Sequence, residues 1–530
     1  MSASTERKNR IAAREAGTDK KTLAAQEEAK KQAVSRRRWT WGTIGVAVLI
    51  AAILILNSGI MYTATTAVDA NGTKYSPAQV NYYYGNDYLT MANQYGSYTS
   101  LLGLDTSMGL SGLGDQECQM LEGGGTWRDY FRNAAKDDIR QVRSLLDYAA
   151  ENGITLTDEE IAEVDAQFEG MEETAKSYGY GSADKLYAMN YGSGVNVKVV
   201  RQAVLDGTLA QKAYNEKQDS LSWTDEELEE YYTGLNGDRD LFDYSYYYVT
   251  AETVETAVTD EEGNESTEMT ATEESRAEAK AVADAIFASY LDGKEIEDFQ
   301  ERFLAAVDSQ TGEAGNQPET RNGTYGSSLD ESYADWLKDS DRQAGNIALF
   351  PDAEEDPAGY TVVLFLDRND NHYATASVRH ILVKAEADED GAYSDEAKEA
   401  AKARAEEILA EYEAGEKTEE SFAALAEQYS EDEGSNTNGG LYENISHGQM
   451  VQEFDEFCFA GHQPGDTGIV YGESGSYAGY HVMYYVGEGQ LYSNYIAESD
   501  LKSDAMSTWS TELNDACTVT EGFGFRFVGK

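Results

Sequence analysis

Two short apolar runs stand out in the hydrophobic pattern of the C-terminal half of the chain. They cover Val378–Lys384 and Tyr480–Val486, and each carries one histidine near its start, His380 in the first and His481 in the second. Runs of this length that are rich in Val, Ile and Tyr predict buried β-strands. The whole chain has only five histidines, so the matched positions of these two indicate a candidate site.

Between the two runs, apolar residues recur every three or four positions, which predicts helices. The first helix is expected from Asp395 to Ala414 and the second from Glu419 to Tyr429. Gly415 follows the first helix, and glycine at this place commonly terminates a helix. These two helices lie between strands that are distant in sequence, and other parts of the chain are predicted to be helical. This arrangement indicates the α+β class.

The segment 66–240 is predicted to be a mostly helical domain. Thr126 can cap a long helix that runs from Trp127 to Glu151, because its hydroxyl can accept a hydrogen bond from a free backbone N–H of the first turn. Before this helix, Asn71-Gly72 predicts the turn of a short β-hairpin.

The C-terminal segment, residues 491–530, is predicted to return to a helix from Ser493 to Leu513. A strand is expected to follow, because Phe523, Phe525 and Phe527 alternate with other residues and alternation predicts a half-buried strand.

The N-terminal end has a different pattern. Residues 1–38 are polar, with 11 Lys and Arg against 5 Asp and Glu, and residues 39–61 are largely apolar. About 20 apolar residues span a bilayer, so the pattern predicts a single transmembrane signal anchor. The basic side is expected to lie in the cytoplasm, which places the bulk of the chain outside the cell membrane. A cleaved signal peptide is the alternative reading of the same run.

Composition narrows the classes of partner and site. A chain of 530 residues is expected to form several domains. Its formal net charge of −56 argues against nucleic acid as a partner, since phosphate binding needs Lys and Arg. Neither a Cys-x-x-Cys nor a His-Glu-x-x-His pattern is present, so the sequence predicts no zinc site. A disulfide between Cys118 and Cys517 stays open, whereas Cys458 is expected to be a core residue.

A series of short motifs occupies residues 377–488. They are Arg379-His380-Ile381-Leu382-Val383, Phe422-Ala423-Ala424-Leu425-Ala426 with Tyr429-Ser430, Gly439-Gly440, Gly448-Gln449-Met450-Val451 with Phe454 and Phe459, and Gly479-Tyr480-His481. In order and spacing this segment resembles the parvulin family of peptidyl-prolyl isomerases. The wider layout resembles the extracytoplasmic foldases PrsA, SurA and PpiD, and the segment 66–240 resembles their helical chaperone domain. The resemblance also implies that the C-terminal segment packs back on that domain.

The resemblance implies an isomerase site that uses neither a metal nor another cofactor. The catalytic roles would fall on His380 and His481, hydrogen-bonded to each other, and on Asp432, whose carboxylate could fix a histidine tautomer. Ala478 stands where some parvulins carry a hydroxyl. The residues expected to bind substrate are Met450, Phe454 and Ser476. The basic cluster of phosphate-reading parvulins is absent after Lys384, so a phospho-Ser-Pro preference is not expected.

Residues 241–370 repeat the order of elements found in 377–488. Ile286 corresponds to Ile408 and Gly293 to Gly415, and Gly359-Tyr360 corresponds to Gly479-Tyr480. A repeat of this kind indicates an internal duplication, and thus a second parvulin-like domain. The earlier copy carries an acidic, threonine-rich insertion from about Glu252 to Thr272. It has Tyr246 and Thr361 at the positions of the two histidines, so it is expected to be inactive.

These features predict an extracytoplasmic peptidyl-prolyl cis-trans isomerase and chaperone for secreted or cell-envelope proteins. Its partners would be unfolded or newly secreted polypeptides that contain X-Pro bonds, and the membrane through the N-terminal helix. The alternative is a binding-only holdase without turnover, in which both parvulin-like domains are client platforms. Homodimerisation stays open.

Overall fold

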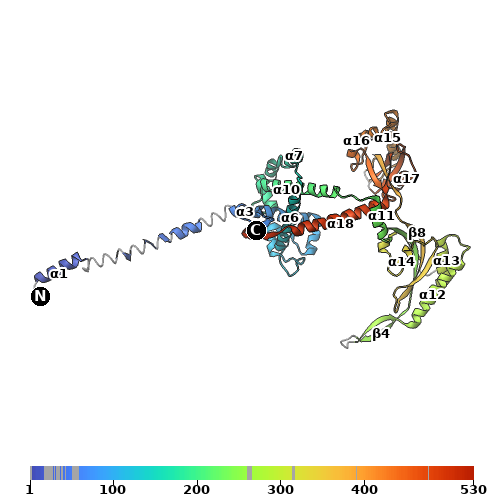
Figure 1. Cartoon of the computed structure of the whole chain (residues 1–530), viewed down its shortest axis with the longest axis horizontal. Coiled ribbons are helices and arrows are strands. Elements are labelled where there is room, and N and C mark those ends of the chain that lie inside the picture. Colours follow the sequence, from blue (N-terminus) through green and yellow to red (C-terminus); the bar gives the residue numbers. More distant parts are fainter. Residues whose placement is uncertain are drawn as a thin grey trace. The chain divides into compact units, whose positions relative to one another are not determined.

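The computed structural model describes residues 3–16, 28, 30–31, 36–37, 40–41, 43–50 and 59–530, the last range without 260–264, 313–316, 389–390 and 476. The chain divides into two compact units. Unit 1 comprises Met1–Leu221 with Asp504–Lys530, and unit 2 comprises Ser222–Ser503. The chain combines a mainly helical unit with antiparallel sheets that are covered by helices (Figure 1), which confirms the predicted α+β class.

The predicted transmembrane helix is not confirmed. Its span, residues 39–61, includes 51–58, which lie outside the described residues. Within the part of the chain that the structure describes, no helix has both the length and the apolar character that a membrane crossing requires. Helix α1 (Ala3–Glu15) precedes the predicted span, and α3 (Ile60–Ala64) overlaps its end.

Unit 1 is mainly helical where the structure describes it, and the long helix α6 begins and ends where the sequence predicts. Thr126 accepts a hydrogen bond from the backbone N–H of Asp129, whose side chain accepts one from the Thr126 N–H in return. Gly153 ends α6 with a φ of 72°, a conformation that glycine adopts without strain. The described helices of this unit include α4 (Pro77–Tyr95), α5 (Gly109–Gly112), α6 (Trp127–Asn152), α7 (Asp158–Ala166), α8 (Met171–Ser177), α9 (Ala183–Tyr191) and α10 (Val197–Asp219).

A small antiparallel sheet in unit 1 joins residues 68–75 to residues 519–521 near the C-terminal end. Its strands β1 (Val68–Ala70), β2 (Thr73–Tyr75) and β13 (Val519–Glu521) have the order β13-β1-β2. Asn71 and Gly72 both have positive φ, 50° and 82°, as the predicted hairpin turn between β1 and β2 requires. The C-terminal strand therefore pairs with the first hairpin of the unit.

The strand predicted over Phe523–Phe527 is wrong, because these residues form the 3₁₀ helix η6. The ladder ends at Glu521, and the Gly524 N–H then donates to the Thr66 carbonyl at 2.7 Å. The Val528 N–H donates back to Phe525 at 3.1 Å, so the tail curls instead of extending. The preceding helix, α18 (Tyr492–Ala516), agrees with the prediction.

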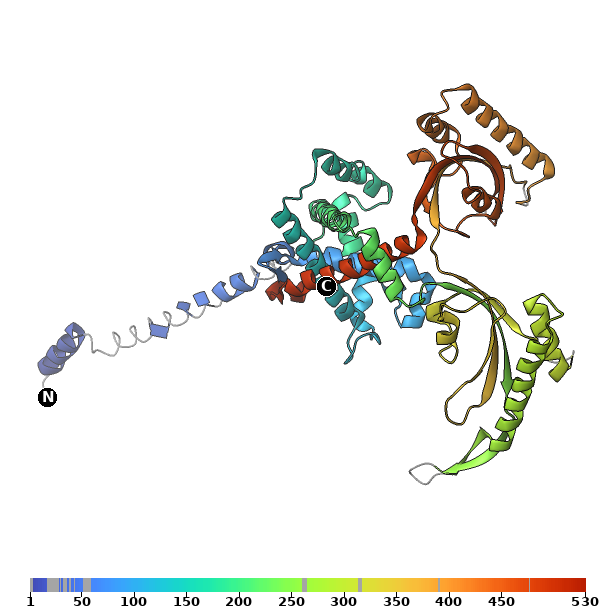
Figure 2. The same cartoon turned by 45° about the vertical axis from the view of Figure 1, so that its right-hand side comes forward.

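Unit 2 contains two four-stranded antiparallel sheets, each with a pair of helices on one face (Figure 2). The first sheet has the order β6-β3-β8-β7. Its strands are β3 (Leu241–Thr250), β6 (Glu319–Tyr325), β7 (Ile347–Pro351) and β8 (Gly359–Asn369). Helices α12 (Glu273–Asp292) and α13 (Phe299–Thr311) cover one face, and α14 (Ala334–Lys338) packs on the other. Helix α11 (Asp225–Gly234) precedes this sheet.

The insertion of the first sheet domain contains two paired strands, β4 (Thr253–Thr259) and β5 (Glu265–Ala271). They form a two-stranded sheet of their own between β3 and α12 (Figure 1). The sequence predicted the place of this insertion.

The second sheet has the order β10-β9-β12-β11. Its strands are β9 (Ala374–Lys384), β10 (Leu441–Ile445), β11 (Thr467–Ser474) and β12 (Tyr477–Leu491). Helices α15 (Asp395–Ala414) and α16 (Glu419–Tyr429) begin and end as predicted and pack on Ile381 and Val482 of one face. Helix α17 (Gln452–Cys458) packs on the opposite face, against Val378 and Met483.

The two sheets share their strand order and their pairing register. Equivalent cross-strand pairs are His380–Met483 with Tyr246–Val363, and Leu382–His481 with Tyr248–Thr361. In the first sheet, Tyr246 and Thr361 thus occupy the strand positions that His380 and His481 occupy in the second.

All three cysteines are buried free thiols. Cys118 and Cys517 belong to the core of unit 1, and the disulfide that the sequence left open between them is not formed. Cys458 packs in the core under α17, as predicted.

The two sheet domains have separate cores, so we expect each to lose its protection from amide hydrogen exchange independently of the other. Phe422 is fully buried under the second sheet and Phe303 is almost fully buried under the first. Phe422→Ala should cost about 3–5 kcal/mol and should speed amide hydrogen exchange in β9 and β12 but not in β3 and β8. Phe303→Ala, the matched control, should do the reverse. Equal loss of protection in both sheets for either variant would show a single cooperative core.

Candidate active site

The centre of the site is a pair of histidines on the two middle strands of the second sheet. His380 lies on β9 opposite Met483, and His481 lies two residues before Met483 on β12, so the two imidazoles are diagonal neighbours on one face. Their Nδ1 atoms are 3.0 Å apart. His380 is 3% exposed and His481 is 4% exposed, which leaves water little access to either ring.

Asp432 lies just beyond the end of α16 and is held by three hydrogen bonds from the loop and β10. Ser435 Oγ donates to Asp432 Oδ2 at 2.5 Å, Tyr442 Oη donates to the same atom at 3.1 Å, and the Gly434 N–H donates to Oδ1 at 3.2 Å. The fourth partner is His380, whose Nε2 lies 3.0 Å from Oδ2. The hydrogen bond from His380 lowers the pKa of the Asp432 carboxyl well below its usual range, so this group is an anion at neutral pH.

The ionised carboxylate determines which nitrogen of His380 donates to it. Because a carboxylate can only accept, His380 donates through Nε2–H, and when its ring is neutral it accepts at Nδ1. His481 therefore donates through Nδ1–H and accepts at Nε2, where the Tyr477 hydroxyl lies 3.0 Å away. Burial, with the neighbouring His380, lowers the pKa of His481 to about 3. The site thus presents the neutral imidazole of His481, which the partly buried carboxylate of Asp432 orients through His380.

An apolar wall faces the two rings. The Phe454 ring of α17 stands edge-on to both imidazoles, with centroid distances of 5.4 Å to His380 and 5.3 Å to His481. Met450 is half-buried and packs against the same cluster. The structure therefore brings His380, His481, Asp432 and Phe454 together, whereas Ser476 lies outside the described residues.

The backbone of β9 comes close to the loop before β10 at the level of His380. The His380 N–H donates to the Gly440 carbonyl at 2.9 Å. A Cβ on Gly440 would lie 2.2 Å from the His380 carbonyl oxygen, and Gly440 has a φ of 72°. Only glycine fits this approach, which gives the Gly439-Gly440 motif a structural reason.

Three hydroxyl groups of the site were not predicted from the sequence. Ser435 and Tyr442 hold Asp432, and Tyr477 reaches His481. Tyr477 lies four residues before His481 on the same strand, and residues at even spacing share one face of a strand, so this signal was available. Ser435 lies on the loop before β10 and Tyr442 on β10, and they reach Asp432 only through the folding of that loop.

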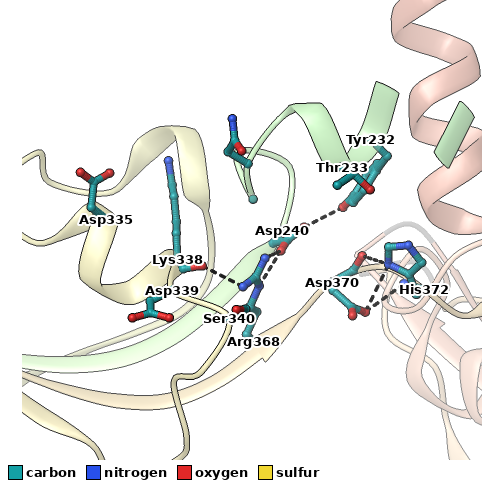
Figure 3. A pocket seen from close by; sticks show the side chains of 12 residues that line it. Tyr232, Thr233, Asp240, Asp335, Lys338, Asp339, Ser340, Arg368, Asp370 and His372 are labelled. Atoms are coloured by element: carbon teal, nitrogen blue, oxygen red, sulfur yellow. Dashed lines mark hydrogen bonds and ion pairs between the residues drawn. The ribbon is translucent and has the colours of Figure 1, made fainter. Parts of the chain in front are cut away.

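A separate polar cavity of about 530 Å³ lies at the junction of α11, α14 and β8. Figure 3 shows Tyr232 and Arg368 directed toward the buried Asp240. The Tyr232 hydroxyl donates to Asp240 Oδ1 at 2.9 Å. The basic side chains are each paired, Arg368 with Asp240, Lys338 with Asp238 and His372 with Glu229. These contacts join α11 to the first sheet, and we assign the cavity a structural role.

The second sheet domain therefore combines an antiparallel four-stranded sheet, helices on one face, and a buried histidine pair facing an apolar wall on the other. These are features expected of a parvulin-type isomerase. Residues 360–484 match the family model of the PPIC-type PPIase domain. The chain thus contains a parvulin-type peptidyl-prolyl isomerase domain, and the enzyme class predicted from the sequence is confirmed.

Solved structures similar to this chain include PrsA foldases. PrsA from Bacillus subtilis is 14% identical over 74% of this chain and 87% of its own, with a TM-score of 0.27. Foldase protein PrsA from Streptococcus pneumoniae is 12% identical over 75% of this chain and 87% of its own, with a TM-score of 0.20. Peptidylprolyl isomerase (PrsA) from Bacillus anthracis is 22% identical over 28% of this chain, with a TM-score of 0.17, and the chain spans 59% of that structure.

No curated protein matches this chain. The whole-chain TM-scores lie below 0.5, so the assignment of the isomerase domain rests on the matched residues and on the geometry of the site.

The neutral state of His481 predicts a pH dependence of stability. Its pKa is about 3 in the folded chain and about 6.5 in an unfolded one. Between these values the unfolded state binds the proton, so stability is retained above pH 6.5 and falls as the pH is lowered toward 3. From pH 7 to pH 5 the wild type should lose about 1–2 kcal/mol more than His481→Gln.

Denaturant-dependent hydrogen exchange of the β9 and β12 amides measures this difference. His447, with a side chain that is 47% exposed, provides the control, and His447→Gln should keep the wild-type dependence. The same pH dependence in wild type and His481→Gln would contradict a buried neutral His481.

Proposed function

We propose that this chain is a membrane-anchored, extracytoplasmic peptidyl-prolyl cis-trans isomerase and chaperone that assists the folding of secreted or cell-envelope proteins. The observation that carries the proposal is the buried, hydrogen-bonded pair of His380 and His481 facing Phe454. The proposed partners are unfolded or newly secreted polypeptides that contain X-Pro bonds.

The chemistry of proline isomerisation fits such a site. Rotation about a peptide bond has a barrier of about 18–20 kcal/mol, because planarity carries the resonance. No covalent bond has to break, so a catalyst must bind the twisted amide better than either planar form. An apolar wall can hold the proline ring, and a fixed set of hydrogen-bonding groups can favour the twisted amide because it needs no reorganisation.

The proposed roles follow from the position of each group. Phe454, with Met450 beside it, binds the proline ring. His380 and His481 form the polar side of the site, and Asp432 holds their orientation through His380. Ser476 remains a proposed substrate-binding residue on the basis of the sequence.

The proposed substrate is an unphosphorylated X-Pro segment. The chain after Lys384 reads Ala385-Glu386-Ala387-Asp388, which supplies carboxylates where a phosphate reader needs cations. Like charges repel, so a phosphorylated residue before proline would be disfavoured there.

The proposed location rests on the N-terminal sequence. Residues 39–61 are apolar and follow a basic segment that ends in Arg36-Arg37-Arg38. A signal anchor with a cytoplasmic N-terminus accounts for both features, and the isomerase domain would then act outside the cytoplasm.

Client binding without turnover is a second candidate function, and the first sheet domain favours it. At the two histidine positions it has Tyr246 and Thr361. Neither residue has an imidazole, so the first sheet lacks the histidine pair. The Tyr246 hydroxyl donates instead to Glu319 at 2.7 Å. Aromatic side chains pack on the same face, where Tyr244 and Tyr333 are buried and Trp336 and Phe350 are only partly buried. The partly exposed rings of Trp336 and Phe350 suit contact with unfolded chains.

The two functions can be separated with one variant. The full chain should accelerate the slow, proline-limited refolding of an unphosphorylated client, and His481→Ala should lower the catalysed rate by about a hundredfold. His481→Ala should still suppress client aggregation, because client binding would use other surfaces. His372→Ala removes an imidazole that pairs with Glu229 outside the site, and it should retain both activities. A wild-type chain that suppresses aggregation without accelerating refolding would leave only the binding function.

A further inference from the structure

The hydroxyl of Tyr477 reaches the far side of the histidine pair. Tyr477 begins β12 and lies four residues before His481, so both side chains project from one face of the strand. The phenolic oxygen is 3.0 Å from His481 Nε2, and the two rings meet nearly at right angles, with a centroid distance of 5.7 Å. Burial raises the pKa of Tyr477, so its hydroxyl keeps its proton and can donate.

A glycine on the neighbouring strand leaves room for this contact. Gly472 of β11 pairs with Gly479 of β12, between Tyr477 and His481. A Cβ on Gly472 would lie 2.6 Å from His481 Nε2 and 3.1 Å from the Tyr477 hydroxyl oxygen. The first distance is shorter than non-bonded carbon and nitrogen atoms tolerate, so any larger residue at 472 would displace one of the two groups.

We propose that Tyr477 is a positioning residue of the isomerase site, whose hydroxyl fixes the tautomer and orientation of His481 from the side opposite to His380. Gly472 is the second part of this device, because it provides the space in which the hydroxyl and the imidazole meet. The inference rests on the proposed function of the histidine pair.

The hydrogen bonds of the site form one continuous chain from Asp432 to Tyr477. Asp432 accepts from His380 Nε2–H, which leaves His380 Nδ1 to accept from His481 Nδ1–H. His481 Nε2 then has a lone pair and no proton, and the Tyr477 hydroxyl donates to it. Asp432 and Tyr477 thus hold the two ends of one chain of hydrogen bonds. Without the hydroxyl, a buried nitrogen would lose its partner, which is costly in a site closed to water.

The neighbouring Ala478 cannot supply this contact. Ala478 is fully buried and projects from the opposite face of β12, because successive side chains of a strand alternate. In this chain Tyr477, one residue earlier, reaches His481 along the face of β12. The long side chain needs the gap above Gly472, which is why the two positions act together.

The test uses the full chain with ¹⁵N-labelled histidine. Nitrogen NMR of the His481 ring reports which ring nitrogen carries the proton, and peptide cis–trans exchange gives kcat/KM. Tyr477→Phe removes only the hydroxyl and keeps the ring. Gly472→Ala leaves Tyr477 unchanged and disturbs the contact from the other strand. The matched control is Tyr471→Phe, because Tyr471 lies on β11 with its hydroxyl bonded to Glu473, away from the pair.

We expect wild type and Tyr471→Phe to show one tautomer of His481, with the proton on Nδ1. Tyr477→Phe and Gly472→Ala should show exchange between two tautomers and a loss of about tenfold in kcat/KM, the factor that corresponds to one hydrogen bond of ordinary strength. A single Nδ1–H tautomer that persists in Tyr477→Phe would overturn the proposal. The nitrogen spectrum reports the tautomer of His481 whether or not the chain is an active isomerase. A wild-type chain without isomerase activity would therefore overturn the proposed function, whereas the spectrum of Tyr477→Phe would still test the positioning role of Tyr477.

Discussion

The hydrogen bond between the Nδ1 atoms of His380 and His481 is the contact on which the site depends. Two buried imidazoles this close cannot both be charged. Burial disfavours the charged form of each ring, and two positive charges at this distance would repel each other. The carboxylate of Asp432 accepts from Nε2–H of His380. The antiparallel register of β9 and β12 sets the distance between the two Nδ1 atoms. The His380 backbone packs closely against Gly440, and the Phe454 ring packs against the His380 imidazole. The polar histidine pair thus lies next to an apolar side of the site.

The two sheet domains of unit 2 show how one scaffold can carry a site or lack it. They share strand order and register, and each buries aliphatic side chains under a pair of helices. On the opposite face, the second domain presents the histidine pair, whereas the first presents Tyr246 and Thr361 beside other aromatic residues. Burial of the helix face stabilises the fold in both cases, so the residues of the other face are free to differ in function.

Local signals were sufficient for much of the fold. Helices α15 and α16 begin and end as predicted, because a capping side chain and three-to-four periodicity act over a few residues. The local pattern was sufficient to place each of the two histidines on a strand, whereas their pairing was implied by the resemblance to the parvulin family. Ser435 and Tyr442 could not be predicted, since they reach Asp432 through a loop. The strand predicted at Phe523–Phe527 was wrong because backbone bonds to Thr66, distant in sequence, decide the path of the tail.

The most direct test of this account compares equivalent positions of the two sheets. Exchange NMR of an unphosphorylated Ala-Pro peptide measures cis-to-trans interconversion with the wild-type chain, His380→Ala and Tyr246→Ala. We expect acceleration by the wild type, its loss in His380→Ala and its retention in Tyr246→Ala, because the histidine pair lies on the second sheet and not on the first. Acceleration that survives His380→Ala, or that disappears in Tyr246→Ala, would contradict it.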